Sequence, residues 1–347
     1  MVEIVEYSGN VGICESCGKE ILPNFPKEVS SRVAYGDTFK IFSTIMSDYA
    51  NVSLRKITEI LSSMCKIKRP SIGSISNWKR EIYNQSEPII EQLKKCIIKR
   101  PVINNDETPC SVNGNHFNYA IGSYTKDISI TEVFSNRSLK SFDKMGILPK
   151  YKGTVVSDHY KAYYSYKNVE NAECNVHISR YLKAVIENTD RPAAKKFYSF
   201  LYDVKKEVEK TEENRVSDER YEEIKNTWLS ILDEWDKEFE EATKGKDKKY
   251  FDDERRLKNR LSEYVDNHLL FAKESEVPFE NNLAERGIRV FKSKLKSCGS
   301  FRSRQSATGY SHFQSICDTA KKNGMDIVDT LLAIKNGNKN IFKFLET

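Results

Sequence analysis

Apolar residues recur at helical spacing through the first hundred positions of the chain. Three sets each form one stripe along a helix, namely Phe42, Ile45, Met46 and Tyr49, then Leu54, Ile57, Ile60 and Leu61, then Ile72, Ile75, Trp78 and Ile82. Residues 66–70 interrupt the pattern. Ser86 followed by Pro88 is typical of a cap and first turn, so a separate helix is expected from there to residue 97. The pattern predicts a helical region over residues 36–100.

The hydrophobic period changes near residue 101. Short segments rich in β-branched and aromatic residues now alternate with turn signals. The predicted elements are strands over 102–112, 117–125 and 128–134, a helix over 138–148, a buried strand over 154–157 and a strand over 172–177. Three strands in a meander followed by further strands with helices predict a mixed α/β sheet.

The stretch 190–275 is helical in composition, with Trp228 and Trp235 one heptad apart. Sustained heptads are absent, which favours an all-α insertion over a coiled coil. The α/β core is expected to resume at Pro278, and helices at about 306–322 and 326–335 to close the chain.

Composition and charge narrow the class of protein. A chain of 347 residues with 39% hydrophobic and 31% charged residues is typical of a soluble protein of two or three domains. No apolar run approaches the ~18 residues that span a bilayer, no signal-peptide pattern opens the chain, and the eight cysteines are too sparse for a disulfide scaffold. We therefore expect a cytoplasmic protein without a membrane partner.

The modest net charge of +6 is unevenly distributed. One segment carries seven basic residues and no acidic ones, namely Arg286, Arg289, Lys292, Lys294, Lys296, Arg302 and Arg304. A local basic stripe of this kind predicts a polyanionic partner.

Three carboxylates have settings that suit metal-dependent phosphoryl transfer. Asp106 and Asp158 each lie in or directly after a predicted strand, and Glu285 lies on a predicted helix. Two magnesium ions held about 3.5–4 Å apart need hard oxygen ligands from different elements. Alone, Asp106 could equally be a turn residue, and Asp158 could cap a following helix.

The Glu285 helix also carries cations beside its acid. Glu285, Arg289, Lys292 and Lys296 fall within about 40° of one line along the helix, with Asn281 on the same side. This face could hold a metal beside a phosphate backbone. The alternative is a solvated face whose charges form ion pairs.

Several motifs together resemble successive blocks of the insertion sequence 66 family of transposases. They are Asn105-Asp106-Glu107-Thr108-Pro109, Ser157-Asp158-His159-Tyr160-Lys161-Ala162-Tyr163, Cys174-x-x-His177-x-x-Arg180, Asn281-Asn282-x-x-Glu285-Arg286-x-x-Arg289 and Gly299-Ser300-Phe301-Arg302-Ser303. The resemblance implies an RNase H-like catalytic core with Asp106, Asp158 and Glu285 as its acidic triad. The triad would hold two magnesium ions.

The chain departs from the family at its N-terminus. Family members usually begin with two Cys pairs that bind zinc, whereas only Cys14 and Cys17 are visible here. A tetrahedral structural zinc site needs four ligands. A metal-free knuckle and a zinc site completed from elsewhere both stay open.

The block around Cys174 and His177 supplies half a zinc site by residue type. The resemblance places it beside the catalytic centre, where His177 or Arg180 could contact a DNA phosphate or organise an acid. A buried structural Cys with a hydrogen-bonded His is the alternative.

Residues 53–82 fit a helix-turn-helix. Its second helix would present Asn77 and Arg80 to base edges and Lys79 to phosphates. A generic helix pair has a similar pattern, but the family has a helical DNA-binding segment at the same place. The remaining expected DNA ligands are His177, Arg180, Asn281, Asn282, Arg286, Arg289, Lys292 and Lys296.

These expectations combine into one organisation. The predicted parts are a partial zinc-knuckle-like segment (1–35), a helical DNA-binding region (36–100), the first part of the RNase H-like core (101–189), an all-helical insertion (190–277) and the second part of the core with C-terminal helices (278–347). We expect a DDE transposase that acts on the DNA ends of an insertion sequence and on target DNA. Further expectations are a homo-oligomer on DNA, accessory transposition proteins and association with the nucleoid. A nuclease that does not join strands, and a catalytically silent DNA-binding derivative, are the alternatives.

Overall fold

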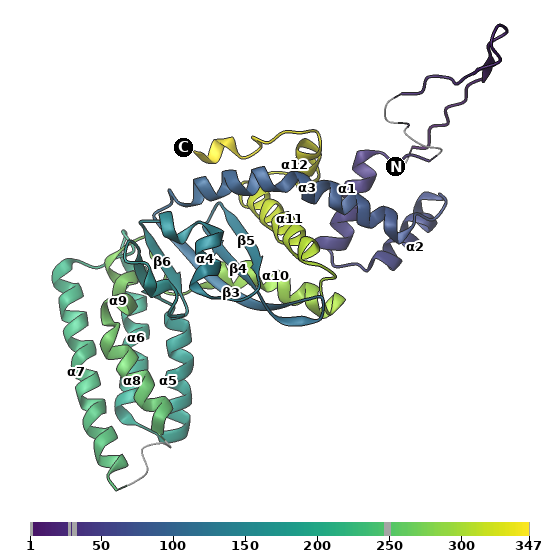
Figure 1. Cartoon of the computed structure of the whole chain (residues 1–347). Helices are drawn as coiled ribbons and strands as arrows, with labels where there is room; N and C mark the ends of the chain where they lie inside the picture. Colours follow the sequence, from purple (N-terminus) through teal and green to yellow (C-terminus); the bar gives the residue numbers. More distant parts are fainter. Residues whose placement is uncertain (1–2, 27–28, 30–32, 246–250, 347) are drawn as a thin grey trace.

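A five-stranded mixed sheet forms the centre of the protein (Figure 1). The computed structural model describes residues 3–26, 29, 33–245 and 251–346. The strand order is β5-β4-β3-β6-β7. In this order β3 (Val102–Val112), β4 (Asn115–Tyr124) and β5 (Ser129–Phe134) are antiparallel neighbours, whereas β6 (Thr154–Ser157) and β7 (Glu170–Glu173) run parallel to β3. Three antiparallel strands followed by two parallel ones confirm the expected RNase H-like α/β fold.

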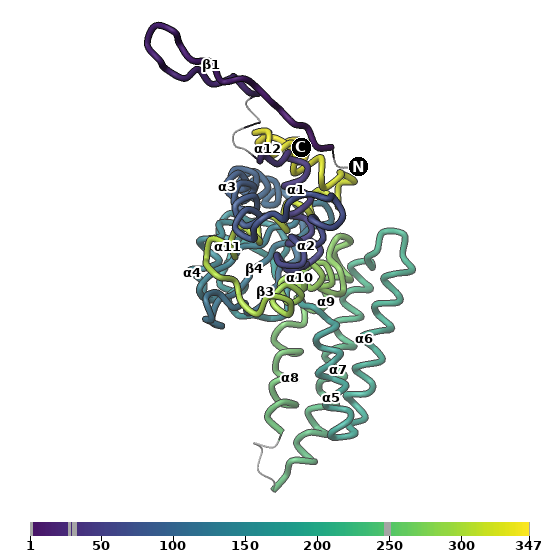
Figure 2. Tube along the Cα trace, turned by 90° about the vertical axis from the view of Figure 1, so that its right-hand side faces the viewer, coloured from purple at the N-terminus to yellow at the C-terminus, as the bar shows by residue number. Residues whose placement is uncertain are grey.

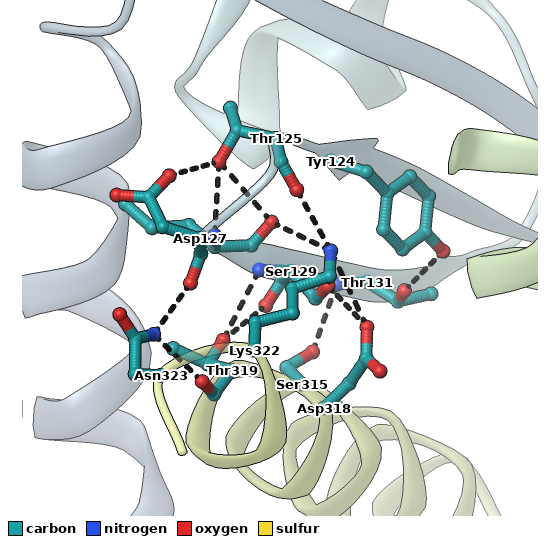
Figure 3. A network of polar contacts seen from close by, with 11 residues as sticks. Tyr124, Thr125, Asp127, Ser129, Thr131, Ser315, Asp318, Thr319, Lys322 and Asn323 are labelled. Carbon is teal, nitrogen blue, oxygen red and sulfur yellow. Dashed lines mark hydrogen bonds and ion pairs between the residues drawn. The ribbon is translucent and has the colours of Figure 1, made fainter.

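The helix α11 (Arg304–Lys322) covers the open edge of this sheet (Figure 3). Hydroxyl oxygens of Thr319 and Ser315 accept hydrogen bonds from the backbone N–H groups of Ser129 and Thr131, at 3.1 and 2.9 Å. Unpaired N–H groups on an edge strand would otherwise be free to pair with another chain. The hydroxyl groups of α11 therefore seal the edge at β5.

The first three helices are α1 (Asp37–Asp48), α2 (Leu54–Cys65) and α3 (Ile72–Ile97). The prediction of a new helix at Ser86 is wrong, because α3 runs unbroken through Pro88. Apolar residues before and after the proline, Ile82 and Ile89 among them, are buried in the main core. This packing outweighs the local cost of proline. Ser86 instead lies 3.0 Å from His312 Nδ1 and so joins α3 to α11.

The buried face of α1 also differs from its predicted apolar stripe. Phe42 and Tyr49 are 49% and 40% exposed, whereas Thr44, Ser47 and Asp48 are buried. The hydroxyl groups of Ser43 and Thr44 donate to carbonyl oxygens one turn earlier in the helix, and Asp48 is held by charged partners described below. A polar face can be buried when each group has a partner.

A bundle of helices projects from the sheet (Figures 1 and 2). Its members are α5 (Asn175–Thr189), α6 (Pro192–Lys210), α7 (Asp218–Thr243), α8 (Asp252–Glu263) and α9 (Val265–Lys273). Trp228 and Trp235 are fully buried in its core, as befits an all-α insertion. Because Ile178 and Leu182 of α5 share that core, the packed bundle begins before residue 190.

The bundle leaves and rejoins the core at one point, where the backbone N–H of Asn175 donates to the carbonyl oxygen of Phe279 at 3.0 Å. The strand predicted over 172–177 is displaced, since β7 ends at Glu173 and α5 begins at Asn175. The four residues of β7 pair one for one with β6, and the short partner limits its length.

The remaining elements complete the chain. They are the hairpin strands β1 (Gly12–Ile13) and β2 (Glu20–Ile21), the helices α4 (Leu139–Met145), α10 (Asn282–Cys298) and α12 (Ile327–Lys335), and the 3₁₀ turns η1 (Leu148–Lys150), η2 (Tyr163–Ser165) and η4 (Lys343–Glu346). The N-terminal hairpin extends away from the other elements (Figure 2). Among the described residues, no helix combines the length and apolar character needed to cross a membrane.

Candidate active site

The first of the candidate acids lies in β3, and the second directly follows β6, the adjacent parallel strand. The register of β3 and β6 pairs Asn104 with Val156. Asp106 and Asp158 each follow that pair by two residues, so the two strands direct them to the same end of the sheet. The pairing of strands therefore accounts for a convergence across 52 positions of sequence.

Two glycines allow the helix carrying Glu285 to approach the sheet closely. A Cβ on Gly287 of α10 would lie 2.1 Å from the ring of Tyr124, and one on Gly122 would lie 2.3 Å from it. Gly122 is the β4 partner of Asp106. The Tyr124 ring thus fits between Gly287 of α10 and Gly122 of β4. Gly287 is two residues after Glu285, so this contact brings the acid of α10 close to the strand beside Asp106.

The start of α10 is fixed to β3 by Asn281. Its side-chain Nδ2 donates to the carbonyl oxygen of Asn105 at 2.8 Å, and its Oδ1 accepts from Asn104 Nδ2 at 2.9 Å. Asn281 is only 1% exposed. Both polar atoms of its side chain are hydrogen-bonded to residues of β3. The expected contact of Asn281 with DNA therefore does not fit this buried position.

Electrostatic repulsion couples Asp106 to the other two acids. Burial and the nearby charges of Asp158, Glu107 and Glu285 raise the pKa of Asp106 to about 7. Asp158 Oδ1 is buried and has no hydrogen-bond partner among the described residues. A carboxylate oxygen without a partner, beside a carboxyl group that resists ionisation, fits a site for cations.

Glu107 belongs to the same neighbourhood but was not predicted as a site residue. It accepts from Tyr163 Oη at 2.8 Å and from Arg137 Nη1 at 3.0 Å. Burial, followed by the charge of Asp158, raises its pKa. Its adjacency to Asp106 was visible in the sequence, but the partners that hold it come from elements 30 and 56 positions away.

The block of Cys174 and His177 also reaches this site. Suitable ligand atoms of Cys174, His177 and Glu285 lie within 4.8 Å of one another. His177 Nε2 is 3.9 Å from Glu285 Oε1. Arg180 follows on α5 and is exposed. His177 therefore lies beside Glu285, one of the three candidate acids.

The basic face of α10 is exposed. Arg286, Arg289, Lys292 and Lys296 are exposed and form no ion pair with any described residue. The alternative of a solvated face neutralised by ion pairs therefore lacks acidic partners in the described chain. Asn282 is half-buried and its amide donates to Glu280.

Lys79 occupies a different position from the one expected of a phosphate ligand. Its Nζ lies 2.7 Å from Asp48 Oδ1 and 3.0 Å from Ser47 Oγ. Lys294 of α10 reaches the same carboxylate at 3.2 Å. Lys79 is thus a partner in a buried network, whereas Asn77 and Arg80 on the same helix are exposed.

A cleft of about 620 Å³ lies between helices α2 and α3 and the segment 297–306. We call it the basic cleft, because Arg55, Arg80 and Arg302 line it. All three are exposed, and none forms an ion pair with a described residue. Hydroxyl groups of Ser53, Ser76 and Ser303 add further donors to its walls.

The N-terminal cysteines lie in the turn of the β1–β2 hairpin. Cys14 N–H donates to the carbonyl oxygen of Lys19 at 2.9 Å, and the Gly18 N–H donates to that of Cys14 at 2.8 Å. Hydrogen bonds from Ser16 and Cys17 lower the pKa of Cys14 to about 7. Within the described residues, no third His, Cys, Asp or Glu joins the pair in a cluster of possible metal ligands. Zinc binding by Cys14 and Cys17 stays a prediction.

Comparison with known proteins identifies the family. A search of curated proteins and a search of solved structures each found no significant match. The family model described as "Transposase IS66 family" matches residues 45–309, which include all three acids, the helical bundle and most of the basic cleft. The chain belongs to the IS66 family of transposases.

Proposed function

We propose that the protein catalyses metal-dependent cleavage of DNA at the ends of an insertion sequence and joins those ends to target DNA. Membership of a transposase family gives the general role. The observation that carries the chemistry is the shared electrostatic field of Asp106, Asp158 and Glu285, which come from β3, the residue after β6, and α10.

Asp106, Asp158 and Glu285 would hold two magnesium ions. The fit rests on the unpartnered Asp158 Oδ1 and on the raised pKa of Asp106, both of which a bound dication would relieve. When bound, magnesium would activate the attacking water or 3′-hydroxyl and stabilise the leaving oxygen of the phosphodiester.

The protein's own residues prepare this site in two ways. Asp106 must lose its proton before it can act as an anionic ligand, so near pH 7 its ionisation accompanies metal uptake. Gly287 and Asn281 set the distance and angle of α10 relative to β3, and thereby position Glu285.

Two surfaces would hold DNA. The exposed face of Arg286, Arg289, Lys292 and Lys296 leads away from Glu285 along α10 and suits the phosphates that flank the scissile bond. His177 lies 3.9 Å from Glu285, and Asn282 is the first residue of α10. Arg180 follows His177 by about one turn on α5 and is exposed. The basic cleft then accepts more distant duplex, with Arg55 and Arg302 on phosphates and Arg80 on base edges. Asn77 is exposed on the same helix as Arg80, outside the lining of the cleft, and would also read bases.

One assay tests the proposal. The protein is incubated with a labelled duplex that carries an end of its own element, a target plasmid and magnesium, and the cleaved and joined products are mapped. Cleavage with joining is expected, and Asp106→Asn, Asp158→Asn and Glu285→Gln should abolish both while DNA binding persists. Cleavage without joining would identify a nuclease. Binding without either reaction would identify a silent DNA-binding derivative.

A further inference from the structure

Cys174, His177 and Glu285 form a compact set of three chemically different ligands. Cys174 precedes α5, His177 lies in its first turn, and Glu285 approaches from α10. Their ligand atoms lie within 4.8 Å of one another. Thiolate, imidazole and carboxylate together suit a borderline-soft divalent ion, whereas magnesium prefers oxygen alone.

Two further observations indicate a ligand. Neither ring nitrogen of His177 has a hydrogen bond to a described residue: Nδ1 is buried and unpartnered, and Nε2 lies 3.9 Å from Glu285 Oε1. The backbone N–H of Asn281 points at Cys174 Sγ from 3.3 Å, an arrangement that stabilises negative charge on sulfur. Among the described residues, Glu285 has His177 as its ion-pair partner, and at 3.9 Å this contact is too long for a hydrogen bond.

We propose that Cys174, His177 and Glu285 bind a thiophilic divalent metal ion of the zinc class. Three protein ligands with a fourth position open to water is a common zinc arrangement. In a tetrahedral zinc site with bond lengths of 2.0–2.3 Å, the ligand atoms lie about 3.3–3.8 Å from one another. The side chains of His177 and Glu285 are 23% and 21% exposed. Rotations of these two side chains would bring the three ligand atoms within bonding distance of one ion.

Binding requires a proton to leave the thiol. Burial raises the pKa of Cys174, so without metal the group is a neutral thiol. As the metal–sulfur bond forms, the S–H bond breaks and its proton passes to solvent. No oxidation occurs.

The consequence for activity rests on the proposed function, because the two sites share Glu285. A zinc-class ion would draw this carboxylate from the magnesium site and inhibit cleavage. The binding itself does not depend on catalysis and can be measured without DNA.

Cobalt(II) is the probe, because a cobalt–thiolate bond gives a near-ultraviolet charge-transfer band. The full-length chain, stripped with a chelator and kept reduced without added thiols, is titrated with cobalt(II) in the absence of magnesium. Cys14→Ser/Cys17→Ser serves as the background, so that the N-terminal pair contributes no thiolate. We expect a saturable band of one-thiolate intensity in this background. The band should disappear on adding Cys174→Ser and persist on adding Asp106→Asn.

His177→Ala provides a second test that leaves the buried sulfur in place. It should weaken cobalt(II) affinity at least tenfold, with an unchanged far-ultraviolet circular dichroism spectrum. Absence of the band from the background protein would overturn the site. So would a band that Cys174→Ser, in folded form, or His177→Ala leaves unchanged. If the background protein shows the cobalt–thiolate band but no magnesium-dependent cleavage, the result counts against the proposed function alone. If it cleaves normally but shows no band, the result counts against this metal site alone.

Discussion

The ammonium of Lys294 on α10 lies 3.2 Å from the fully buried carboxylate of Asp48 on α1. Lys79 of α3 approaches the same carboxylate at 2.7 Å, and Tyr83 donates a hydrogen bond to it. Burial alone would raise the pKa of Asp48, but the charges of Lys79 and Lys294 outweigh it and hold the pKa below its ordinary value. One acid therefore joins the N-terminal helices to the helix that carries Glu285.

Asp48→Asn should destabilise the fold strongly. The substitution leaves two buried ammonium groups without a counter-charge, which costs about 3–5 kcal/mol of unfolding free energy at pH 7. The folded pKa of Asp48 lies below the ordinary 3.8. The stabilisation by its ionised carboxylate is therefore fully present above pH 3.8 and is lost as pH falls through the folded pKa. Urea denaturation at pH 7 and at decreasing acid pH measures both effects. Asp37→Asn, which removes a half-exposed acid from α1, should cost less than about 1 kcal/mol. Equal losses for the two variants would contradict the account.

Asp106→Asn should stabilise the metal-free protein while abolishing cleavage. The pKa of about 7 lies roughly 3 units above the ordinary 3.8, which corresponds to roughly 4 kcal/mol at most. Because the folded pKa is raised, Asp106 does not destabilise the fold below pH 3.8. Its cost in unfolding free energy grows between pH 3.8 and pH 7 and is complete above pH 7. Unfolding in a chelator at pH 8 should therefore favour the variant, with the difference shrinking toward pH 4. The exposed control Asp233→Asn should show no such trend. A destabilised Asp106→Asn protein at pH 8 would show that the acid is paired rather than repelled.

Gly287→Ala should impair both stability and cleavage. The added methyl group would lie 2.1 Å from the Tyr124 ring, so α10 or the ring must move. Overpacking of this kind costs about 1–3 kcal/mol, and displacement of α10 moves Glu285. Gly73→Ala on α3 is the matched control, since its nearest new contact is Ser71 Oγ at 3.5 Å. The control should be neutral or stabilising by up to about 1 kcal/mol. Thermal midpoints and cleavage rates of both variants decide the matter, and normal behaviour of Gly287→Ala would disprove the tight approach.

Lys292→Glu should weaken cleavage without unfolding the protein. An exposed charge contributes little to stability, but reversal places an anion where the DNA backbone is expected. Cleavage is measured across a salt series at subsaturating DNA, and the defect should change with ionic strength because phosphate contacts are screened by salt. Lys237→Glu, on the exposed side of α7, should cleave normally. A lowered thermal midpoint with normal cleavage would make the basic face structural.

Asn77 and Arg302 should fail in different ways when replaced by alanine. Arg302→Ala should weaken binding to cognate and random duplexes alike and reduce the salt slope by about one unit if it neutralises one phosphate. Asn77→Ala should instead reduce discrimination between them by ~1–3 kcal/mol if it reads a base. Fluorescence anisotropy on both duplexes at several salt concentrations separates the two effects. Equal affinity of the unmodified protein for both duplexes would remove the basis for assigning base recognition to Asn77.

Strands and acids were predictable where the information is local. The range of β3 and the position of β6 follow from runs of β-branched residues, and the acids follow from their settings at those strands and on the next core helix. The helix around Pro88 was not predictable from local sequence, because burial of Ile82 and Ile89 against distant segments decides whether α3 continues. Asp48 shows it again. A buried acid on α1 becomes understandable only beside Lys294, 246 positions later in the chain.

The single hydrogen bond between Asn175 and Phe279 has a consequence for how such chains diversify. Where a segment starts and finishes at neighbouring points, its length can change without altering the distance that the surrounding framework must span. Deletions, enlargements or exchanges of the projecting bundle would then leave the spacing between β6 and α10 intact. The 127 positions that separate Asp158 from Glu285 in this chain need not be shared by its relatives. A replacement of residues 176–278 by a short flexible linker would show whether the remaining framework folds as a minimal module.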